Sequence, residues 1–524
     1  MEGVEFIACF PPTPIINAAH EAGIRLILTR KERVAVNIAD GYARVSRRPG
    51  VASMMQGGGV ENAFAGVAQA WEDLVPILVL PGGVPRHSIG SRTFDTIHCY
   101  LRVTKWVERI NLADRIPEMM RRAFTYLKTG RPSPVLLEVP DDVAEEELDE
   151  GKFDYKPVKG WKTPGDPEDV RVAVRALLNA RNPLIYVGEG VFYAGAWEEL
   201  REFAELVQAP VMTSMKAKSV FPENHPLSVG FIRGRPVEYF LKKADLIFSI
   251  GASLAKVPLA CWFPPGKTIV QSTIDEWDIN KDYRADHVII GDSKLVLRQL
   301  IEEVKRQGGE RPPNEALMEE IRRQKEEWLK EWMPYFTSSE VPINPYRVIW
   351  DLMNTVDRTK TIVTHDSGNP RDQLSSFYEA IIPRGYIGWG HITTLGYSLG
   401  GAMGAKLAEP EKTVINVMGD GAFGMVGMDF ETAVREKIPI TTIILNNYGF
   451  GGYDKYAPYS YHVSGNYYKV AEGLGAYTEK IEEPDEVGPA IKRAIKANES
   501  GKAALLEIRT RMFPVYPSFP GASW

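Results

Sequence analysis

The sequence contains little cysteine. Its 524 residues include three, Cys9, Cys99 and Cys261, and none of them has the CxxC spacing of a zinc or redox site. This pattern argues against a disulfide framework and fits a reducing cytoplasm, where we expect the protein. An excess of positive charge is also lacking, because the net charge is −6. The sequence therefore predicts neither a nucleic acid nor a membrane surface as its main partner.

Signals for export and for membrane insertion are weak as well. The N-terminal stretch MEGVEFIACF carries acidic side chains where a secretory signal would need a basic region. The stretch from Gly385 to Ala405 is uncharged over 21 residues, which is long enough to cross a bilayer, but it contains seven glycines. We expect a glycine-rich loop that leads into a buried helix.

A chain of this length is too long for one hydrophobic core and predicts about three domains. Apolar strand-like runs alternate with helical segments throughout, which is typical of α/β domains with doubly wound parallel sheets. We expect such domains at residues 1–145, 168–305 and 345–510, followed by a tail at residues 511–524.

Two segments should connect the domains. Residues 145–167 are acidic and interrupted by prolines, which predicts an irregular linker. Residues 302–342 are highly charged, but Leu317, Ile321 and Trp328 recur at near-helical intervals. They predict an exposed helix with one apolar face that bridges the second and third domains.

A polar cluster is expected where two strands of the third domain end. The apolar run at residues 414–418 is followed by Gly419-Asp420-Gly421, and the run at residues 440–445 is followed by Asn446-Asn447. Because parallel strands end at the same edge of a sheet, Asp420 and Asn447 should face each other. Carboxylate and amide oxygens suit Mg²⁺, and the glycines let a diphosphate approach the backbone.

A carboxylate also follows a strand of the first domain. Glu32 lies where the run from Ile24 to Leu28 gives way to a helix with Val36, Ala39 and Ala43 on its apolar face. A glutamate in the first turn of a helix is favourable to the helix dipole and is usually solvated. On this position alone, a structural role and a functional role both stay open.

The combination of these motifs resembles the thiamine diphosphate enzymes of the acetolactate synthase and pyruvate decarboxylase superfamily, and acetolactate synthase large subunits in particular. The resemblance rests on Glu32 with the phrase Ala39-Asp40-Gly41-Tyr42-Ala43-Arg44, and on Gly419-Asp420-Gly421 with Asn447, 27 residues after Asp420. It implies three domains in the order pyrimidine-binding, middle and diphosphate-binding. It also implies a homodimer or homotetramer, in which the first domain of one subunit and the third domain of another form each active site.

The resemblance implies roles for individual residues. Glu32 would be the catalytic residue, because a carboxyl group beside the pyrimidine ring can share a proton with a ring nitrogen and so activate the cofactor. Asp420, Asn447 and the backbone carbonyl of Gly449 would bind Mg²⁺. The residues expected to contact the cofactor are Gly368, Asn369, Thr394, Leu395, Gly419, Gly421, Ala422 and Phe423, with Leu395 beneath its rings. Those expected in the substrate pocket are His87, Phe94, His98 and Tyr448, and the tail at residues 511–524 is expected to cover the entrance.

The implied reaction makes or breaks a carbon–carbon bond beside a carbonyl, with a 2-keto acid or an aldehyde as substrate and the cofactor as electron sink. An acetolactate-synthase-like carboligase is the first prediction. One loop departs from that family at Gly83, Asp95 and Thr96, and only Phe94 matches there. A 2-keto-acid decarboxylase or an aldehyde lyase of the same fold is therefore the alternative. An alternative from another class is a catalytically inert, thiamine diphosphate-binding regulatory subunit, whose hallmark would be loss of the acid at position 32.

The middle domain lacks the flavin signature of some relatives. Residues Ala252 to Lys256 stand where those relatives carry an Arg-Phe-Asp-Asp-Arg phrase, so FAD is not expected. A phosphate group or a coenzyme A tail on Lys216 or Lys218 stays an open hypothesis. Relatives also carry an extra helix before the segment that matches Glu2 to Glu5, and a truncated N-terminus would expose apolar surface on the first domain.

Overall fold

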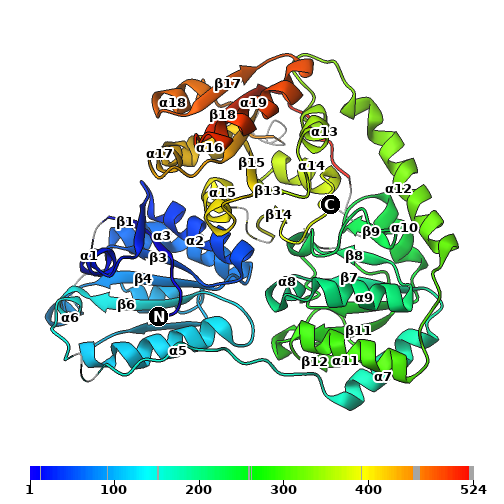
Figure 1. The fold of residues 1–524 in the computed structure, drawn as a ribbon, viewed down its shortest axis with the longest axis horizontal. Helices are drawn as coiled ribbons and strands as arrows, with labels where there is room; N and C mark the ends of the chain where they lie inside the picture. The colour runs from blue at the N-terminus through cyan, green and yellow to red at the C-terminus, as the bar shows by residue number, and fades with distance from the viewer. Residues whose placement is uncertain are drawn as a thin grey trace.

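Three parallel sheets of six strands each dominate the chain, and they occupy the corners of a triangle (Figure 1). The computed structural model describes residues 1–11, 13–90, 93–149, 151, 153–257, 260, 262–390, 392, 394–451 and 461–517. Within these residues, helices alternate with strands along the chain and cover the sheets. The predicted α/β class, with three doubly wound parallel sheets, is confirmed.

The first sheet has the strand order β2-β1-β3-β4-β6-β5. Its strands are β1 (Phe6–Phe10), β2 (Arg25–Leu28), β3 (Gly50–Met54), β4 (Ile77–Gly83), β5 (Trp106–Arg109) and β6 (Val135–Pro140). Its helices are α1 (Pro14–Glu21), α2 (Glu32–Ser46), α3 (Gly58–Glu72), α4 (Thr96–Tyr100), α5 (Ile116–Lys128) and α6 (Asp141–Ala144). The strands β3 and β6 are buried along their whole length, because both faces of a parallel sheet are covered.

The second sheet has the strand order β12-β11-β10-β7-β8-β9. Its strands are β7 (Pro183–Val187), β8 (Val211–Thr213), β9 (Ser228–Phe231), β10 (Leu246–Ile250), β11 (Thr268–Thr273) and β12 (His287–Ile290). Its helices are α7 (Pro167–Asn179), α8 (Gly190–Ala194), α9 (Trp197–Val207), α10 (Arg235–Lys243) and α11 (Ser293–Arg306). Two apolar clusters, one on each face of this sheet, form its core.

The third sheet has the strand order β14-β13-β15-β16-β18-β17. Its strands are β13 (Thr361–His365), β14 (Tyr386–Ile387), β15 (Thr413–Gly419), β16 (Thr441–Asn446), β17 (Tyr477–Ile481) and β18 (Ala504–Arg509). Its helices are α13 (Pro345–Thr355), α14 (Asn369–Phe377), α15 (Tyr397–Ala408), α16 (Asp420–Val426), α17 (Phe430–Arg435), α18 (Tyr467–Gly473) and α19 (Val487–Glu499). The strands β15 and β16 are direct neighbours, and Gly419 pairs with Leu445, so their carboxyl ends lie side by side.

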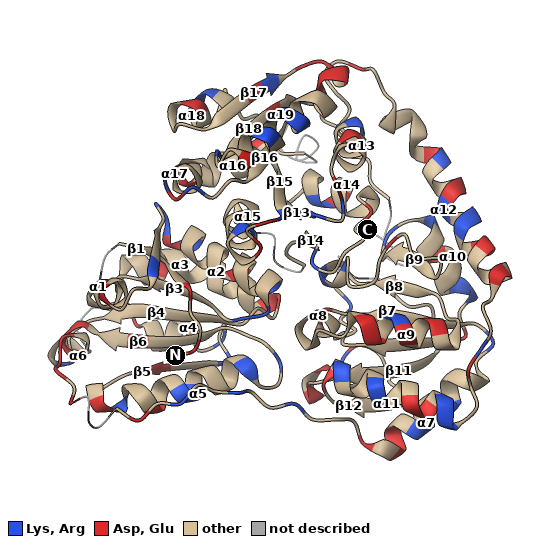
Figure 2. Cartoon of the chain, in the orientation of Figure 1, with Lys and Arg blue, Asp and Glu red and all other residues tan. Residues whose placement is uncertain are grey.

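The helix α12 (Glu315–Phe336) confirms the predicted charged helix between the second and third sheets. Figure 2 shows basic and acidic residues along the length of α12. Its apolar residues point the other way. Leu317 and Ile321 pack on the second sheet, and Trp328 packs on the core of the third. The helix therefore bridges two cores with one apolar face.

The first and third sheets meet through α2 and α15, which lie side by side (Figure 1). Gly41 of α2 and Gly401 of α15 bring the two backbones into contact, because a Cβ atom on Gly41 would lie 2.2 Å from the carbonyl oxygen of Gly401. The uncharged stretch that starts at residue 385 thus contributes a buried helix, as predicted. Within the described ranges, no helix is long and apolar enough to cross a membrane.

A buried cation reinforces this contact. Arg44 of α2 donates hydrogen bonds to Asp40, to Asp73 and to the carbonyl oxygen of Gly388. Asp73 also accepts a hydrogen bond from the backbone N–H of Gly390. The guanidinium and the two carboxylates compensate one another's charge inside the interface. The first and third sheets are therefore joined by packing and by hydrogen bonds.

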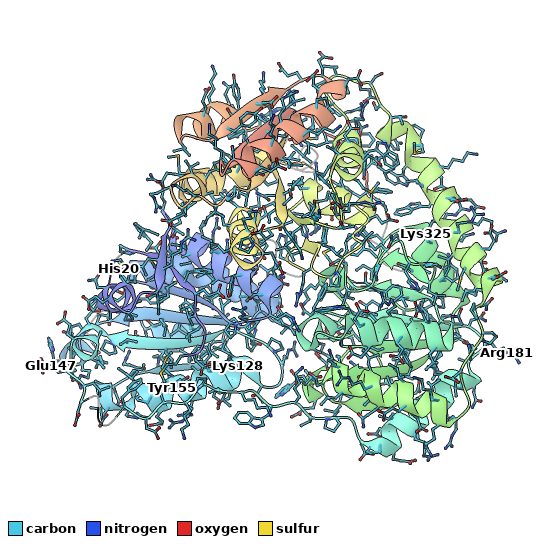
Figure 3. All side chains as sticks on the ribbon, viewed as in Figure 1. His20, Lys128, Glu147, Tyr155, Arg181 and Lys325 are labelled. Carbon is cyan, nitrogen blue, oxygen red and sulfur yellow. The ribbon has the colours of Figure 1, made fainter. Side chains whose placement is uncertain are left out.

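A buried ion pair joins the second and third sheets. The ammonium group of Lys218 lies 2.6 and 2.5 Å from the two carboxylate oxygens of Glu223. Glu223 also accepts a hydrogen bond from the backbone N–H of Ala380, and its carbonyl oxygen accepts one from Lys325 of α12. Figure 3 labels Lys325 beside α12, near the junction of these sheets. Lys218 is 2% exposed and its charge is already matched inside the protein, so a phosphate or coenzyme A tail there would have to displace Glu223; that hypothesis stays a prediction.

The start of the chain is fixed to the segment that leaves the first sheet. Glu2 accepts hydrogen bonds from Lys128, from the hydroxyl of Tyr155 and from the backbone N–H of Val158. Lys128 and Tyr155 are labelled near α5 in Figure 3. Between α6 and α7 the part of the chain that the structure describes forms no α-helix or β-strand, which agrees with the predicted linker.

Candidate active site

The first half of the candidate site lies at the carboxyl edge of the third sheet, where β15 ends and α16 begins. Asp420 is the first residue of α16, and it is only 2% exposed. Its carboxylate accepts hydrogen bonds from the backbone N–H groups of Gly421, at 2.8 Å, and Gly449, at 3.2 Å. Burial raises the pKa of Asp420 to about 6, and the backbone hydrogen bonds oppose that shift. A cation bound to this oxygen would favour the charged form.

Asn447 reaches the same point from the neighbouring strand. Its side-chain oxygen accepts a hydrogen bond from the N–H of Gly449 at 3.0 Å, and the same N–H contacts Asp420. The structure therefore brings a carboxylate oxygen and an amide oxygen to one backbone amide. The carbonyl oxygen of Gly449 accepts no hydrogen bond from the described residues, so it can serve as a third oxygen donor.

This donor set is suited to a hard cation. Groups of three or more His, Cys, Asp or Glu side chains that could hold a metal are absent from the residues the structure describes. One carboxylate with amide and carbonyl oxygens is instead the kind of partial ligand set that Mg²⁺ completes with water and phosphate oxygens.

Two glycines leave open space beside these ligands. Gly368 precedes α14 with a φ of 76°, and no atom lies within 4 Å of the position that its Cβ would take. The same space exists beside Gly419, at the end of β15. The strands β13 and β15, which lead to these glycines, are neighbours in the sheet. Open space at two adjacent strand ends is what the approach of a diphosphate to the backbone requires, so the residues fit such a group.

Asp366 orders the loop that carries Thr394 and Leu395. It is completely buried, and its carboxylate accepts hydrogen bonds from the N–H of Gly396 and from both the N–H and the hydroxyl of Ser398. Thr394 and Leu395 are half-buried, and Leu395 packs against the apolar cluster between the first and third sheets. The sequence analysis missed Asp366 as a functional candidate, although an acid directly after a buried strand was the signal used elsewhere in this domain.

Ala422 and Phe423 face the core. They are 3% and 1% exposed, and the ring of Phe423 meets that of Tyr467 edge-on. Contact between a cofactor and these two residues is therefore limited to their backbone. Gly421 is needed for packing, because a Cβ atom there would lie 2.4 Å from the ring of Phe450.

The C-terminal tail approaches this edge of the sheet. The hydroxyl of Tyr516 donates a hydrogen bond to the side-chain oxygen of Asn369, the first residue of α14. The side-chain amide of Gln373, one turn further along α14, donates to the carbonyl oxygen of Phe513. Phe513 and Tyr516 thus contact α14, whereas residues 518–524, which were also expected to form a lid, lie outside the described residues.

The second half of the candidate site lies at the carboxyl edge of the first sheet. Glu32 opens α2 and is 6% exposed. One of its carboxylate oxygens accepts a hydrogen bond from the side-chain amide of Asn62 on α3, and the other would lie 3.4 Å from a Cβ atom on Gly59. The acid therefore lies against the first turn of α3. Asn62 was missed, because its spacing from Glu32 carries no local signal.

The four residues predicted for the substrate pocket have different surroundings. His87 and His98 are exposed, and the side chain of His98 is 81% exposed. Phe94 packs against the core of the first sheet. Tyr448 belongs to the third sheet, where the guanidinium of Arg509 lies over its ring at 4.0 Å. Within the described ranges, no contact joins Tyr448 to the other three.

Each chain presents two separate half-sites. Across the residues that the structure describes, no hydrogen bond or ion pair joins Glu32 to Asp420 or Asn447. The partners of Glu32 belong to the first sheet, and those of the two metal-ligand candidates belong to the third. One half-site offers a buried carboxyl group, and the other offers hard oxygen ligands beside space for phosphate groups. This pair of features suits a cofactor that carries both a diphosphate and a basic ring nitrogen.

A separate cavity of about 620 Å³ lies at the carboxyl edge of the second sheet. Its charged walls are largely paired. Lys216 lies 2.5 Å from Glu189, and Arg131 lies 2.8 Å from Asp275. A phosphate group on Lys216, the remaining part of the earlier hypothesis, would have to compete with a carboxylate that already neutralises it.

Family models match part of each of the three domains. "Thiamine pyrophosphate enzyme, N-terminal TPP binding domain" matches residues 2–102, the central domain of the same family matches residues 170–300, and its C-terminal TPP binding domain matches residues 366–508. Thiamine pyrophosphate is another name for thiamine diphosphate. The chain belongs to the thiamine pyrophosphate enzymes, and thiamine diphosphate is its cofactor.

Within this family the chain is similar to acetolactate synthase large subunits over nearly its whole length. A probable acetolactate synthase large subunit from Methanocaldococcus jannaschii is 32% identical, over 95% of this chain and 88% of the relative. Another from Methanococcus aeolicus is 31% identical over the same shares. The large subunit of acetolactate synthase isozyme 3 from Escherichia coli is 29% identical, over 97% of this chain and 92% of its own length. The resemblance inferred from the motifs is thereby confirmed.

Proposed function

We propose that this protein is an acetolactate-synthase-like carboligase that uses thiamine diphosphate and Mg²⁺ and acts on a 2-keto acid, with pyruvate as the first substrate to test. The observation that carries the proposal is the convergence of Asp420 and Asn447 on the N–H of Gly449, at the strand ends where the family motif predicts the metal. The similarity to acetolactate synthase large subunits over 95% of the chain supports the choice of reaction.

The diphosphate half-site would anchor the cofactor. Asp420, Asn447 and the carbonyl oxygen of Gly449 would hold Mg²⁺, and the space beside Gly368 and Gly419 would receive the diphosphate. When bound, thiamine diphosphate would supply a thiazolium ring that acts as the electron sink for the electron pair left on the substrate's former carbonyl carbon. By resemblance, the other cofactor contacts would come from Asn369, Thr394, Leu395, Gly421, and the backbone of Ala422 and Phe423.

The acid half-site would control a proton. Glu32 would hold a proton at a ring nitrogen of the pyrimidine, and Asn62 would orient the carboxyl group through its hydrogen bond. By resemblance, Leu395 would support the cofactor rings from below. The side chains proposed for the substrate pocket are His87, Phe94, His98 and Tyr448, with the tail at residues 511–524 as a cover.

We further propose that two subunits complete each active site, in a homodimer or homotetramer where Glu32 of one subunit faces Asp420 of another. Large apolar side chains are exposed near both half-sites, which supports a contact between subunits there. They are Met55 and Phe64 in the first sheet region and Met425 and Met428 in the third. We also propose domain boundaries at residues 1–145, 168–305 and 345–510, because each range encloses one sheet. The proposed location is the cytoplasm.

The test of the reaction is product analysis with purified protein, thiamine diphosphate, Mg²⁺ and pyruvate. Acetolactate is the expected product. A decarboxylase or aldehyde lyase of the same fold is the second candidate, because Gly83, Asp95 and Thr96 depart from the acetolactate synthase pattern. Acetaldehyde without acetolactate would favour this candidate. A panel of 2-keto acids and aldehydes would then define the substrate.

The test of the acid is the substitution Glu32→Gln. It should leave the binding of thiamine diphosphate and Mg²⁺ intact and lower kcat by about 10²- to 10⁴-fold, the usual contribution of acid–base catalysis. Glu21→Gln, at the exposed end of α1, is the matched control and should keep wild-type activity. Full activity of Glu32→Gln would show that the acid is misassigned. If wild-type protein does not accelerate exchange of the thiazolium proton with deuterium, the inert regulatory subunit is favoured instead.

A further inference from the structure

The turn that precedes Glu32 is held by the third sheet of the same chain. Asp429 ends a short 3₁₀ turn (Gly427–Asp429) between α16 and α17, and it is completely buried. Its Oδ1 atom accepts hydrogen bonds from the backbone N–H groups of Arg30, at 2.8 Å, and Lys31, at 3.2 Å. Lys31 is the N-cap residue of α2 and provides no side-chain cap. The carboxylate that steadies the start of α2 therefore comes from another sheet.

Two further contacts join the turn before Glu32 to the region around Asp429. The ammonium group of Lys31 donates to the carbonyl oxygen of Met425, and the guanidinium of Arg435 donates to the carbonyl oxygen of Leu28. These two contacts are made by exposed side chains, which contribute little to rigidity in water. The hydrogen bonds to Asp429 are part-buried, their acceptor is completely buried, and they reach the backbone itself, so they constrain the path of the chain into α2.

We propose that Asp429 is a positioning residue for Glu32. It accepts hydrogen bonds from the backbone N–H groups of the two residues immediately before Glu32 and thereby sets where the carboxyl group stands relative to Asn62. The role of Glu32 itself rests on the proposed function. Without Asp429, these two part-buried backbone N–H groups would lose their acceptor, and the turn would have to shift or admit water.

The surroundings of Asp429 favour a carboxylate at this position. Arg33 follows Glu32 in α2, and the charges of Asp366 and Asp429 act on its guanidinium. Burial lowers the pKa of Arg33, and these two acids oppose that shift. The Oδ2 atom of Asp429 is buried and accepts no hydrogen bond from the described residues, so its negative charge remains available to Arg33. Asp429 thus acts on both sides of Glu32, through the backbone before it and through charge after it.

The first test does not depend on activity. Amide hydrogen exchange is measured by mass spectrometry on the full-length protein with thiamine diphosphate and Mg²⁺, for a peptide that covers Arg30 and Lys31. In wild-type protein these amides should be protected. In Asp429→Ala they should exchange about 10- to 100-fold faster, because the buried acceptor is gone. Equal exchange in the two proteins, or unprotected amides in the wild type, would overturn the proposal.

The second test separates positioning from stability. Asp429→Ala should lower kcat and the rate of thiazolium-proton exchange by about 10²-fold, the effect of a shift of about 1 Å at a reacting group. The KM and the Kd of thiamine diphosphate should stay within about threefold, because the cofactor ligands are untouched. Asp429→Asn keeps an oxygen acceptor and should recover most of kcat. Glu431→Ala is the matched control, because Glu431 contacts the exposed side chain of Arg30 and not its backbone N–H group.

The outcomes distinguish this inference from the proposed function. If wild-type protein does not accelerate proton exchange, the proposed function fails. If wild-type protein does so, Glu32→Gln does not, and Asp429→Ala matches the wild type, then only the role of Asp429 is overturned. A lower unfolding temperature with unchanged kcat per folded site would likewise reduce Asp429 to a structural residue. If Asp429→Ala does not fold, the proposal is tested on wild-type protein and on Asp429→Asn. Unprotected amides at Arg30 and Lys31 in wild-type protein would refute it.

Discussion

Replacement of Gly41 by alanine should force apart the helices that join the first and third sheets. The added Cβ would lie 2.2 Å from the carbonyl oxygen of Gly401, 2.7 Å from its Cα and 2.8 Å from its carbonyl carbon. All three atoms belong to the backbone of α15, so no rotamer change can relieve the overlap. Because Cβ atoms do not approach other atoms closer than 3.0 Å, α2 and α15 must separate by about 1 Å.

The size of the effect follows from two opposing terms. Alanine is favoured over glycine inside a helix by about 1 kcal/mol. Overpacking against rigid neighbours costs about 1–3 kcal/mol, and the severity of this overlap places it at the upper end. The net loss in the free energy of unfolding should be about 2 kcal/mol. Activity should suffer more, because α2 begins with Glu32 and a displacement of about 1 Å can lower a rate by about 10²-fold.

The assay is urea unfolding of the purified protein together with kcat. Gly473→Ala is the matched control, because Gly473 ends α18 and has no atom within 4 Å of its Cβ position. The control should unfold at the same urea concentration as wild-type protein or a slightly higher one. Wild-type unfolding and a wild-type rate for Gly41→Ala would refute the argument that these helices are in backbone contact.

Two more substitutions test the diphosphate half-site and the interior. Asp420→Ala should abolish Mg²⁺-dependent binding of thiamine diphosphate, measured by isothermal titration calorimetry. Removal of Mg²⁺ from wild-type protein with a chelator should have the same effect. Undiminished binding in either case would contradict the metal assignment. Glu223→Ala leaves the ammonium of Lys218 buried without its counter-charge and should lower the free energy of unfolding by about 3–5 kcal/mol. Replacement of both Lys218 and Glu223 by methionine should recover most of the lost free energy of unfolding, measured by urea unfolding. A double variant that is no more stable than Glu223→Ala would argue against a desolvated ion pair.

Much of the fold and part of the candidate site could be predicted from local patterns. The strands β15 and β16 follow each other in the chain with a short helical connection, so their ends had to lie close together in a parallel sheet. That topology places Asp420 and Asn447 without knowledge of the rest of the molecule. The position of Glu32 followed in the same way, from a strand, a turn and a helix start.

The residues that support the site could not be predicted in this way. Asp429 and Asn62 act across pairs of elements that are distant in sequence, and the hydrogen bond from Arg30 to Asp429 spans 399 positions. A single sequence contains no periodicity that reports such a pair. The burial of Ala422 and Phe423 was also out of reach, because the direction that each side chain takes in a short helix depends on where the helix begins.

Because α2 packs directly on α15, the first and third sheets are held in their relative positions by this contact and not by the chain that connects them. The described part of the segment between α6 and α7 then acts as a tether, and the length of a tether can change with little effect on stability, whereas α12 is itself packed on two cores. The contact between α2 and α15 therefore does not depend on the order of the three sheets along the polypeptide. A chain permuted within a tether would keep its matching surfaces and both of its half-sites.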